Sequence, residues 1–131
     1  MAIRRVLSVG QCGVGNAAIR RLFRQRFDAD IVPAPGSAEA VAELHRGHYD
    51  LVLVNRVFYH GGLGLELIAA IKTDPFLQDI PVILVSDLPA AQLRAEGLGA
   101  EPGFGKAALA RPETTDRIAA ALHHAASAAG R

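Results

Sequence analysis

Short runs of apolar and β-branched residues alternate along the chain with longer stretches whose apolar residues recur at helical spacing. The short runs predict buried β-strands, and the longer stretches predict amphipathic helices. Strands that alternate with helices are typical of a parallel sheet covered by helices on both faces. The predicted strands are Arg5–Val9, Asp30–Pro33, Tyr49–Asn55, Pro81–Ser86 and Gly103–Gly105.

The boundaries of the predicted helices follow from glycine, proline and capping residues between the strands. Residues 13–27 form the first helix, and its apolar stripe consists of Ala18, Ile19, Leu22, Phe23 and Phe27. Ser37 is the predicted N-cap of a second helix, which Gly47 ends. Proline at the first position of a helix and glycine after its last residue indicate the boundaries of the remaining helices. The remaining helices are predicted at residues 65–73, at residues 89 to 97 or 99, and from residue 112 onward.

Composition limits the class of protein. Half of the residues are hydrophobic, 21% are charged and the formal net charge is +1, which excludes a disordered chain. The balanced charge favours neither a nucleic-acid partner nor a membrane partner. No internal repeat or linker interrupts the pattern, so we expect one domain, residues 1–131, with a core at about 4–124 and a frayed tail at 125–131.

The sequence also bears on localisation. Its first residues carry too short an apolar stretch for a signal peptide, and no run reaches the roughly 18 apolar residues of a spanning helix. The single Cys12 has no second cysteine to pair with, which fits a reducing compartment. We therefore expect a cytoplasmic protein.

Candidate chemistry lies where the predicted strands end. Parallel sheets of this kind bind ligands at the carboxyl ends of their strands, near the point where the strand order reverses. The residues that follow or end the strands there include a glycine, polar side chains and one cation, namely Gly10, Gln11, Cys12, Asn55, Ser86 and Lys106.

Four segments resemble the receiver domain of two-component response regulators, in the family's order and over nearly the whole chain. YDLVLVN at residues 49–55 resembles the third strand, whose last residue is the phospho-accepting aspartate, and GLEL at 64–67 resembles the start of the third helix. IPVILVS at 80–86 resembles the fourth strand with its switch hydroxyl, and GAEPGFGK at 99–106 resembles the run that ends in the family's lysine. The resemblance implies a flavodoxin-like, doubly wound α/β fold with a five-stranded parallel sheet in the order 2-1-3-4-5.

The departures from the receiver pattern decide the functional prediction. Asn55 stands where the family has its aspartate, and Gly10 and Gln11 stand where it has the acidic pair that holds Mg²⁺. A carboxamide is a poor nucleophile, and a pocket without these carboxylates should bind Mg²⁺ poorly. We therefore predict a degenerate phosphorylation pocket of Gly10, Gln11, Asn55, Ser86 and Lys106, with no metal, no cofactor and no catalytic residue. Ala107 also replaces the family's proline after the lysine.

The resulting prediction is a pseudo-receiver, not an enzyme, that binds a signalling protein independently of phosphorylation. The resemblance implies that the surface of the fourth helix, fifth strand and fifth helix, about Pro89 to Ala126, contacts the partner. A homodimer is a further alternative. The apolar candidates for this surface, some of which must be core, are Leu93, Leu98, Phe104, Leu109 and Leu122.

Two other functions stay open. Residues 13–18, GVGNAA, match G-x-G-x-x-A after a strand and at the opening of a helix, which is the context of a nucleotide- or dinucleotide-binding sensor. Its candidate residues are Gly10, Gly13, Gly15 and Asn16, although the second strand lacks the ribose-binding acid at its end. The second alternative is a receiver phosphorylated at an unusual acceptor such as Asp87 or Ser86.

Two surface features have plainer interpretations. The glycine-containing loop from Phe58 to Gly64 suggests a mobile lid beside the pocket, with His60 as a titratable side chain. Arginines on the first predicted helix form a basic face, which we interpret as solvated; they are Arg20, Arg21, Arg24 and Arg26.

Overall fold

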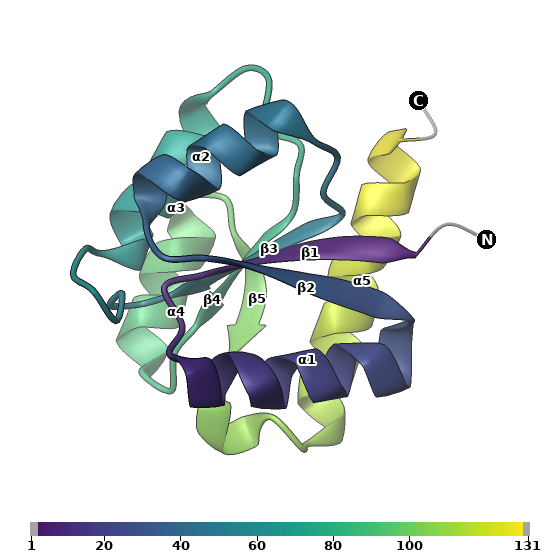
Figure 1. Cartoon of the computed structure of the whole chain (residues 1–131). Helices are drawn as coiled ribbons and strands as arrows, with labels where there is room; N and C mark the ends of the chain where they lie inside the picture. Colours follow the sequence, from purple (N-terminus) through teal and green to yellow (C-terminus); the bar gives the residue numbers. More distant parts are fainter. Residues whose placement is uncertain (1–2, 130–131) are drawn as a thin grey trace.

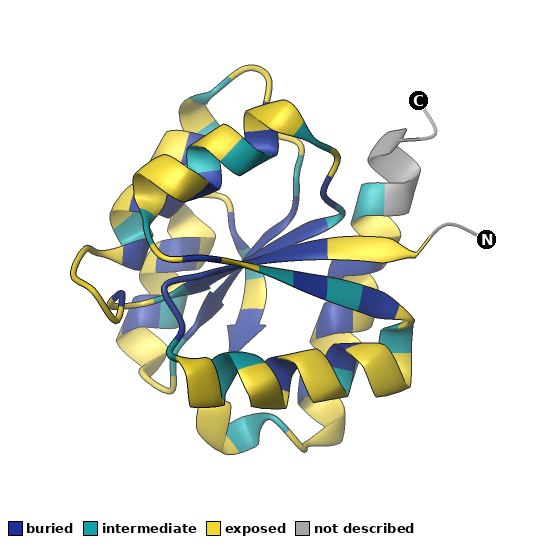
Figure 2. Cartoon of the chain, in the orientation of Figure 1, coloured by how far each residue is buried: buried dark blue, intermediate teal, exposed yellow. Residues whose placement is uncertain are grey.

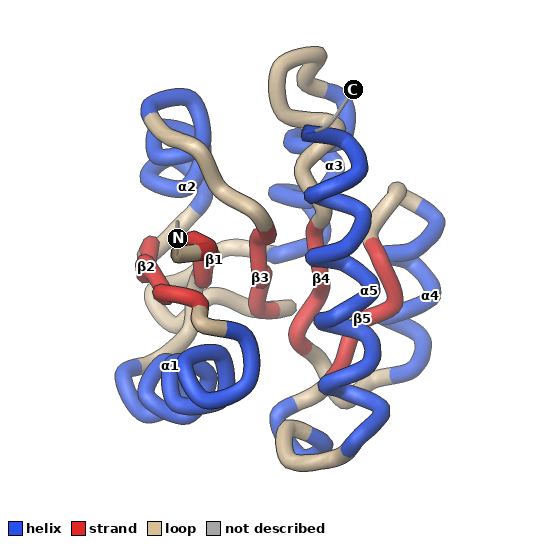
Figure 3. The backbone as a smooth tube through the Cα atoms, turned by 90° about the vertical axis from the view of Figure 1, so that its right-hand side faces the viewer, coloured by secondary structure: helices blue, strands red, loops and turns tan. Residues whose placement is uncertain are grey.

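The computed structural model describes residues 3–129, with side chains from Ile3 to Ala125. One parallel sheet contains five strands in the order β2-β1-β3-β4-β5, which confirms the predicted topology (Figures 1 and 3). The strands are β1 (Arg4–Val9), β2 (Ala29–Ala34), β3 (Leu51–Asn55), β4 (Val82–Val85) and β5 (Glu101–Phe104).

Four helices connect successive strands, as parallel pairing requires, and a fifth follows the last strand. In chain order they are α1 (Gly13–Phe27), α2 (Ser37–Arg46), α3 (Gly64–Thr73), α4 (Pro89–Gly97) and α5 (Pro112–Ala129), with a short 3-10 helix at Lys106–Ala108. The predicted frayed tail, residues 125–131, falls on the end of α5, which remains helical through Ala129. Residues 130 and 131 lie outside the described part of the chain.

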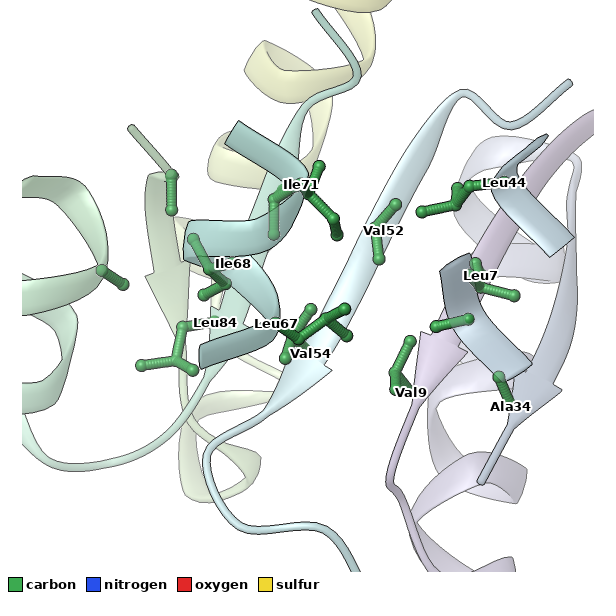
Figure 4. Close-up of a cluster of buried hydrophobic side chains, with 14 of the residues drawn as sticks. Leu7, Val9, Ala34, Leu44, Val52, Val54, Leu67, Ile68, Ile71 and Leu84 are labelled. Carbon is green, nitrogen blue, oxygen red and sulfur yellow. The ribbon is translucent and has the colours of Figure 1, made fainter. Parts of the chain in front are cut away.

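The two faces of the sheet carry separate cores because strand side chains alternate between faces. Val52 and Val54 of β3 pack toward α2, α3 and α4, whereas Leu51 and Leu53 pack toward α1 and α5. Figure 4 shows the first of these cores, and Figure 2 shows that the interior of the sheet is buried while the outer helix surfaces are exposed. The prediction that β3 is buried on both faces is confirmed.

Several local predictions need correction. The N-cap of α2 is Gly36, and Ser37 is the first helical residue, so the serine side chain makes no capping bond. Ala18 is exposed, because the core-facing side of α1 is defined by the larger Ile19 and Phe23. Strand β5 starts at Glu101, earlier than predicted, since Pro102 and Gly103 hide its strand character in the sequence.

No helix among residues 3–129 is long and apolar enough to cross a membrane.

Candidate functional site

Asn55 ends β3 and lies at the carboxyl end of the sheet. Its Nδ2 donates hydrogen bonds to the backbone carbonyl oxygens of Gly10, at 3.2 Å, and Val57, at 2.9 Å. Both partners are acceptors only, so the amide is oriented with its nitrogen toward them. A carboxylate at residue 55 would place an oxygen where the structure has a hydrogen-bond donor.

Gly10 presents its carbonyl to Asn55 because its backbone is in the left-handed region, with φ of 78°. The same carbonyl accepts the Tyr59 N–H at 3.0 Å. A Cβ at this position would overlap the buried ring of Phe58. Only glycine combines this φ with such close packing, so Gly10 fixes the acceptor that orients Asn55.

The loop after β3 is closed by its own backbone. Val57 and Leu63 form an antiparallel bridge, Phe58 N–H donates to the Gly62 carbonyl at 3.0 Å, and Gly64 N–H donates to the Arg56 carbonyl at 2.8 Å. Phe58 anchors the loop, since only 3% of its surface is exposed. Residues 58–64, which the sequence suggests as a mobile lid, thus form a loop closed by a tight turn at Gly61 and Gly62, both of which have positive φ.

A pocket of about 380 Å³ lies beside Asn55. Ser86 Oγ, at its wall, accepts the Leu88 N–H at 3.1 Å, and Asp87 Oδ1 accepts the Ala107 N–H at 3.3 Å. The lining residues come from the ends of β3 and β4 and the start of the short 3-10 helix; they are Asn55, Arg56, Val57, Val85, Ser86, Asp87, Leu88 and Lys106.

Three of the five residues predicted for the degenerate phosphorylation pocket, Asn55, Ser86 and Lys106, line this pocket together. Gly10 joins them through its bond to Asn55. Gln11 is not among the lining residues; it is 8% exposed, and neither its Nε2 nor its Oε1 has a hydrogen-bond partner within the described part of the chain.

Within the described part of the chain, Lys106 makes no hydrogen bond to Asn55 or to a backbone carbonyl. Its Nζ instead lies against the first turn of α1, 3.0 Å from where a Cβ on Gly15 would stand. Cys12 caps that turn, and its Sγ accepts the Gly15 N–H at 3.4 Å. This hydrogen bond lowers the pKa of the Cys12 thiol, and the Lys106 ammonium lowers it further, against a raising effect of burial.

The candidate nucleotide-binding residues lie in and just before this turn. Gly13 and Gly15 are the first and third residues of α1, and Asn16 accepts a hydrogen bond from the buried Ser8 hydroxyl at 2.8 Å. The Gly15 amide, which a bound pyrophosphate would use, already donates to Cys12. The Gly15 amide is therefore not free for a pyrophosphate, and the nucleotide alternative stays a prediction.

The structure adds pocket residues that the sequence did not single out. Arg56 follows β3 directly, so its place next to Asn55 in the sequence could have identified it as a pocket residue. The Val57 contribution is a backbone carbonyl, which no side-chain pattern reveals. Gln92 of α4 reaches the same end of the sheet, where its Nε2 donates to the carbonyls of Leu84, at 2.9 Å, and Ser86, at 3.0 Å. The β4–β5 pairing is irregular at this point, which leaves the Leu84 carbonyl available to Gln92.

A magnesium ion does not fit these residues. Asp87 is the single carboxylate in the pocket lining, and one of its oxygens already accepts a backbone N–H. The Gly10 and Val57 carbonyls are occupied by the Asn55 amide, and Mg²⁺ prefers free oxygen ligands. Among the described residues, no three His, Cys, Asp or Glu side chains are grouped to hold a metal ion.

The predicted partner surface is partly core. Phe104 and Leu122 are buried, whereas Leu93 is 71% exposed and Leu98 is 40% exposed. Leu109 is half-buried against the α1 and α5 core. A groove of about 560 Å³ lies between α4 and α5 over β5, with Leu93 at its wall.

The sequence matches no family model and no curated protein sequence. The structure, however, resembles solved receiver domains. The signal receiver domain of a DNA-binding response regulator from Colwellia psychrerythraea 34H is 23% identical, with a TM-score of 0.77 over 92% of this chain and 98% of that chain. A response regulator receiver protein from Pseudomonas putida is 22% identical, with a TM-score of 0.75 over 92% and 98%.

The signal receiver domain of a signal transduction histidine kinase from Syntrophus aciditrophicus is 22% identical, with a TM-score of 0.72 over 98% of this chain and 93% of that chain. At such identities the likeness defines the fold. The chain therefore has the flavodoxin-like fold of receiver domains, as the sequence predicted.

Proposed function

We propose that this chain is a pseudo-receiver of a two-component or phosphorelay-type signalling system, which binds a signalling protein without being phosphorylated. The observation that carries the proposal is the Asn55 amide, which donates to the Gly10 and Val57 carbonyls at the end of β3. In this proposal the domain catalyses no reaction and needs no metal.

The chemistry of the pocket supports the loss of phosphorylation. Transfer of a phosphoryl group to a receiver needs a carboxylate oxygen that forms the new P–O bond while the donor's bond breaks. The Asn55 carboxamide is a poor nucleophile, and the Gly10 and Gln11 positions carry no carboxylate to hold a metal beside it. Lys106 alone cannot replace a metal ion that coordinates donor and acceptor together.

The α4–β5–α5 surface is the proposed partner site. Leu93 exposes 71% of its surface beside the groove, and exposed apolar side chains next to a groove are typical of protein interfaces. The partner is a signalling protein, and a second copy of the chain is the alternative.

The proposal is tested by incubating the purified protein with acetyl phosphate and Mg²⁺ and measuring intact mass. We expect no added phosphoryl group. A phosphoryl group mapped to Ser86 or Asp87 would replace this proposal with the alternative of an unusual acceptor. A parallel thermal-shift panel of nucleotides tests the sensor alternative, because a ligand of the native state must raise the melting temperature.

The partner surface needs its own experiment. Leu93→Glu should weaken the binding of a partner identified with the wild-type protein by about tenfold or more, since it places a charge in an apolar contact. Phe76→Glu is the matched control, because Phe76 is 86% exposed and lies in the α3–β4 loop, away from this surface. Equal partner affinity of the two variants would mean that the partner does not bind at the α4–β5–α5 surface.

A further inference from the structure

The α3–β4 loop carries an exposed aromatic ring at the amino end of the sheet. Phe76 exposes 86% of its surface, the largest fraction among the large apolar side chains from Ile3 to Ala125. A single exposed apolar residue is ordinary in a soluble domain. Phe76 differs from the others because its backbone is held in place and a pocket lies beside it.

Hydrogen bonds fix the backbone around Phe76. Its own N–H donates to Asp74 Oδ1 at 2.8 Å. The N–H groups of Leu77 and Gln78 both donate to the Asp74 carbonyl, at 3.1 and 2.9 Å. Lys72 Nζ then donates to the Gln78 carbonyl at 3.0 Å. The loop is therefore preorganised, which lowers the conformational entropy that its ring would lose on binding a partner.

Helix α2 supports the same loop from one side. His45 Nε2 lies 3.1 Å from Asp74 Oδ2, and the His45 ring meets the Phe76 ring edge-on, with the two centroids 6.5 Å apart. Phe76 is thus steadied by a polar neighbour instead of by the core. Most of its surface stays open to a partner.

A pocket of about 310 Å³ lies beside Phe76, which forms part of its wall. Two exposed polar side chains, His48 and Asp79, also line it. The apolar part of the lining comes from the ends of α2 and α5 and from the segments that lead into β3 and β4; it consists of Leu44, Tyr49, Ile80, Pro81 and Ala125. A projecting ring and an apolar hollow therefore share one face of the molecule, which we call the Phe76 face.

We propose that the Phe76 face binds a second copy of the chain in a symmetric dimer, in which Phe76 of each copy fills the pocket of the other. A twofold axis pairs a surface patch with itself. A patch that has both a projecting ring and a hollow is complementary to its own copy. An aromatic side chain seated in a pocket with a polar rim is typical of the residues that dominate interface energies.

The charges of the Phe76 face are also self-complementary. His48 Nε2 pairs with Asp50 Oδ1 at 3.0 Å, so Nδ1 of the protonated ring remains for a second carboxylate. Asp79 supplies that carboxylate from the other copy, and the twofold axis forms the contact twice. The dimer goes beyond the proposed function, because the Phe76 face shares no residue with the groove between α4 and α5.

The test is sedimentation of the whole chain at protein concentrations from micromolar to millimolar. We expect a reversible equilibrium in which the average mass rises from that of one chain toward that of two. Phe76→Glu should weaken the self-association by about tenfold or more, since it places a charge in an apolar contact. Ala125→Gln, which puts a longer side chain into the pocket and leaves Phe76 intact, should weaken it as well.

A matched control shows whether the effect is specific. Val14 is 83% exposed on α1, and Val14→Glu should leave the self-association unchanged. Circular dichroism checks that each variant is folded. Phe76→Glu should also keep the wild-type affinity for the signalling partner, which separates the Phe76 face from the α4–β5–α5 surface.

The inference is overturned if the wild type stays monomeric at millimolar concentration, or if Phe76→Glu self-associates as tightly as the wild type. It is also overturned if Leu93→Glu abolishes the dimer and Phe76→Glu does not, because the copies would then meet at the α4–β5–α5 surface. An added phosphoryl mass with acetyl phosphate would defeat the proposed function alone, whereas a monomeric wild type would defeat this inference alone.

Discussion

The two ends of the sheet differ in how their polar side chains are satisfied. At the amino end, Tyr49 donates to Glu43 at 2.7 Å and accepts from Arg5 at 3.1 Å, while Lys72 donates to the carbonyls of Gln78 and Ile80. All five ion pairs formed among the described side chains lie at this end. These contacts join the ends of α1, α2, α3 and α5 to the neighbouring strands and loops.

At the carboxyl end the backbone is tightly packed, but several polar side chains lack partners. Arg56 and Lys106 form no ion pair with other described residues. Within the same range, the buried side-chain atoms without a hydrogen bond are Gln11 Nε2, Gln11 Oε1 and Gln92 Oε1, and all three belong to this end. Most buried polar groups in proteins are bonded, so Gln11 and Gln92 are exceptions within this fold. Side-chain bonds and ion pairs therefore stabilise the amino end, whereas the carboxyl end is held mainly by its packed backbone.

Overpacking the carboxyl end should have the largest effect. A Cβ on Gly64 would overlap the Asn55 carbonyl and lie 2.9 Å from Val54 Cγ1. Gly64→Ala should therefore lower the free energy of unfolding by about 3 kcal/mol, measured by urea denaturation. Gly13→Ala is the control, since nothing lies within 4 Å of that position and alanine suits a helix. A small effect of Gly64→Ala would mean that the loop after β3 is not rigid.

A pair of lysines compares the two ends directly. Lys72 at the amino end donates to two carbonyls, and burial lowers its pKa, whereas Lys106 has no such partner. Lys72→Met should cost about 2 kcal/mol of unfolding free energy because it leaves those carbonyls unpaired. Lys106→Met should change it by less than about 0.5 kcal/mol. Equal costs in thermal or urea unfolding would contradict the difference between the ends.

The smallest effect concerns pH at the amino end. The Tyr49 hydroxyl bond, followed by the charges of Arg46 and Arg5, holds the pKa of Glu43 below its ordinary value of 4.5, although partial burial opposes the shift. A carboxyl group with a lowered folded-state pKa stabilises the protein above its unfolded pKa. That contribution is lost as pH falls from about 4.5 through the folded value.

The wild type should therefore have a larger free energy of unfolding than Glu43→Gln near neutral pH. This difference between the two proteins should shrink as the pH falls below 4.5. The measurement is urea unfolding of both proteins at a series of pH values. Glu113→Gln, at the exposed start of α5, serves as the control and should show no such trend. A constant difference between wild type and Glu43→Gln across the series would count against the Tyr49–Glu43 bond.

Much of the fold could be predicted because hydrophobic periodicity reflects burial. The LVLV run of β3 is buried on both faces, and Pro89 and Pro112 begin helices where their fixed φ and missing N–H are tolerated. The errors concern the exact residues at which a helix or a strand begins. Gly36, not Ser37, is the N-cap of α2, and Pro102 with Gly103 hid the start of β5.

The candidate site was predicted only in outline. Strand ends brought Asn55, Ser86 and Lys106 into one pocket, as a parallel sheet requires. The bonds of Asn55 could not be predicted, because its partners are backbone carbonyls whose directions depend on the φ of Gly10 and the closed loop after β3. The sequence also could not predict that Lys106 has no ion-pair partner among the described residues, because pairing depends on how the folded chain places its charges.

The loss of phosphorylation at this pocket is tested by the intact mass of the wild type and of Asn55→Asp after incubation with acetyl phosphate and Mg²⁺. A receiver domain that carries the aspartate serves as the positive control, and circular dichroism checks that the variant is folded. We expect no phosphoryl group on either protein, because Gly10 and Gln11 leave Mg²⁺ without its carboxylates. Ready phosphorylation of Asn55→Asp at residue 55 would contradict it, since a single amide would then be all that separates this pocket from a working receiver.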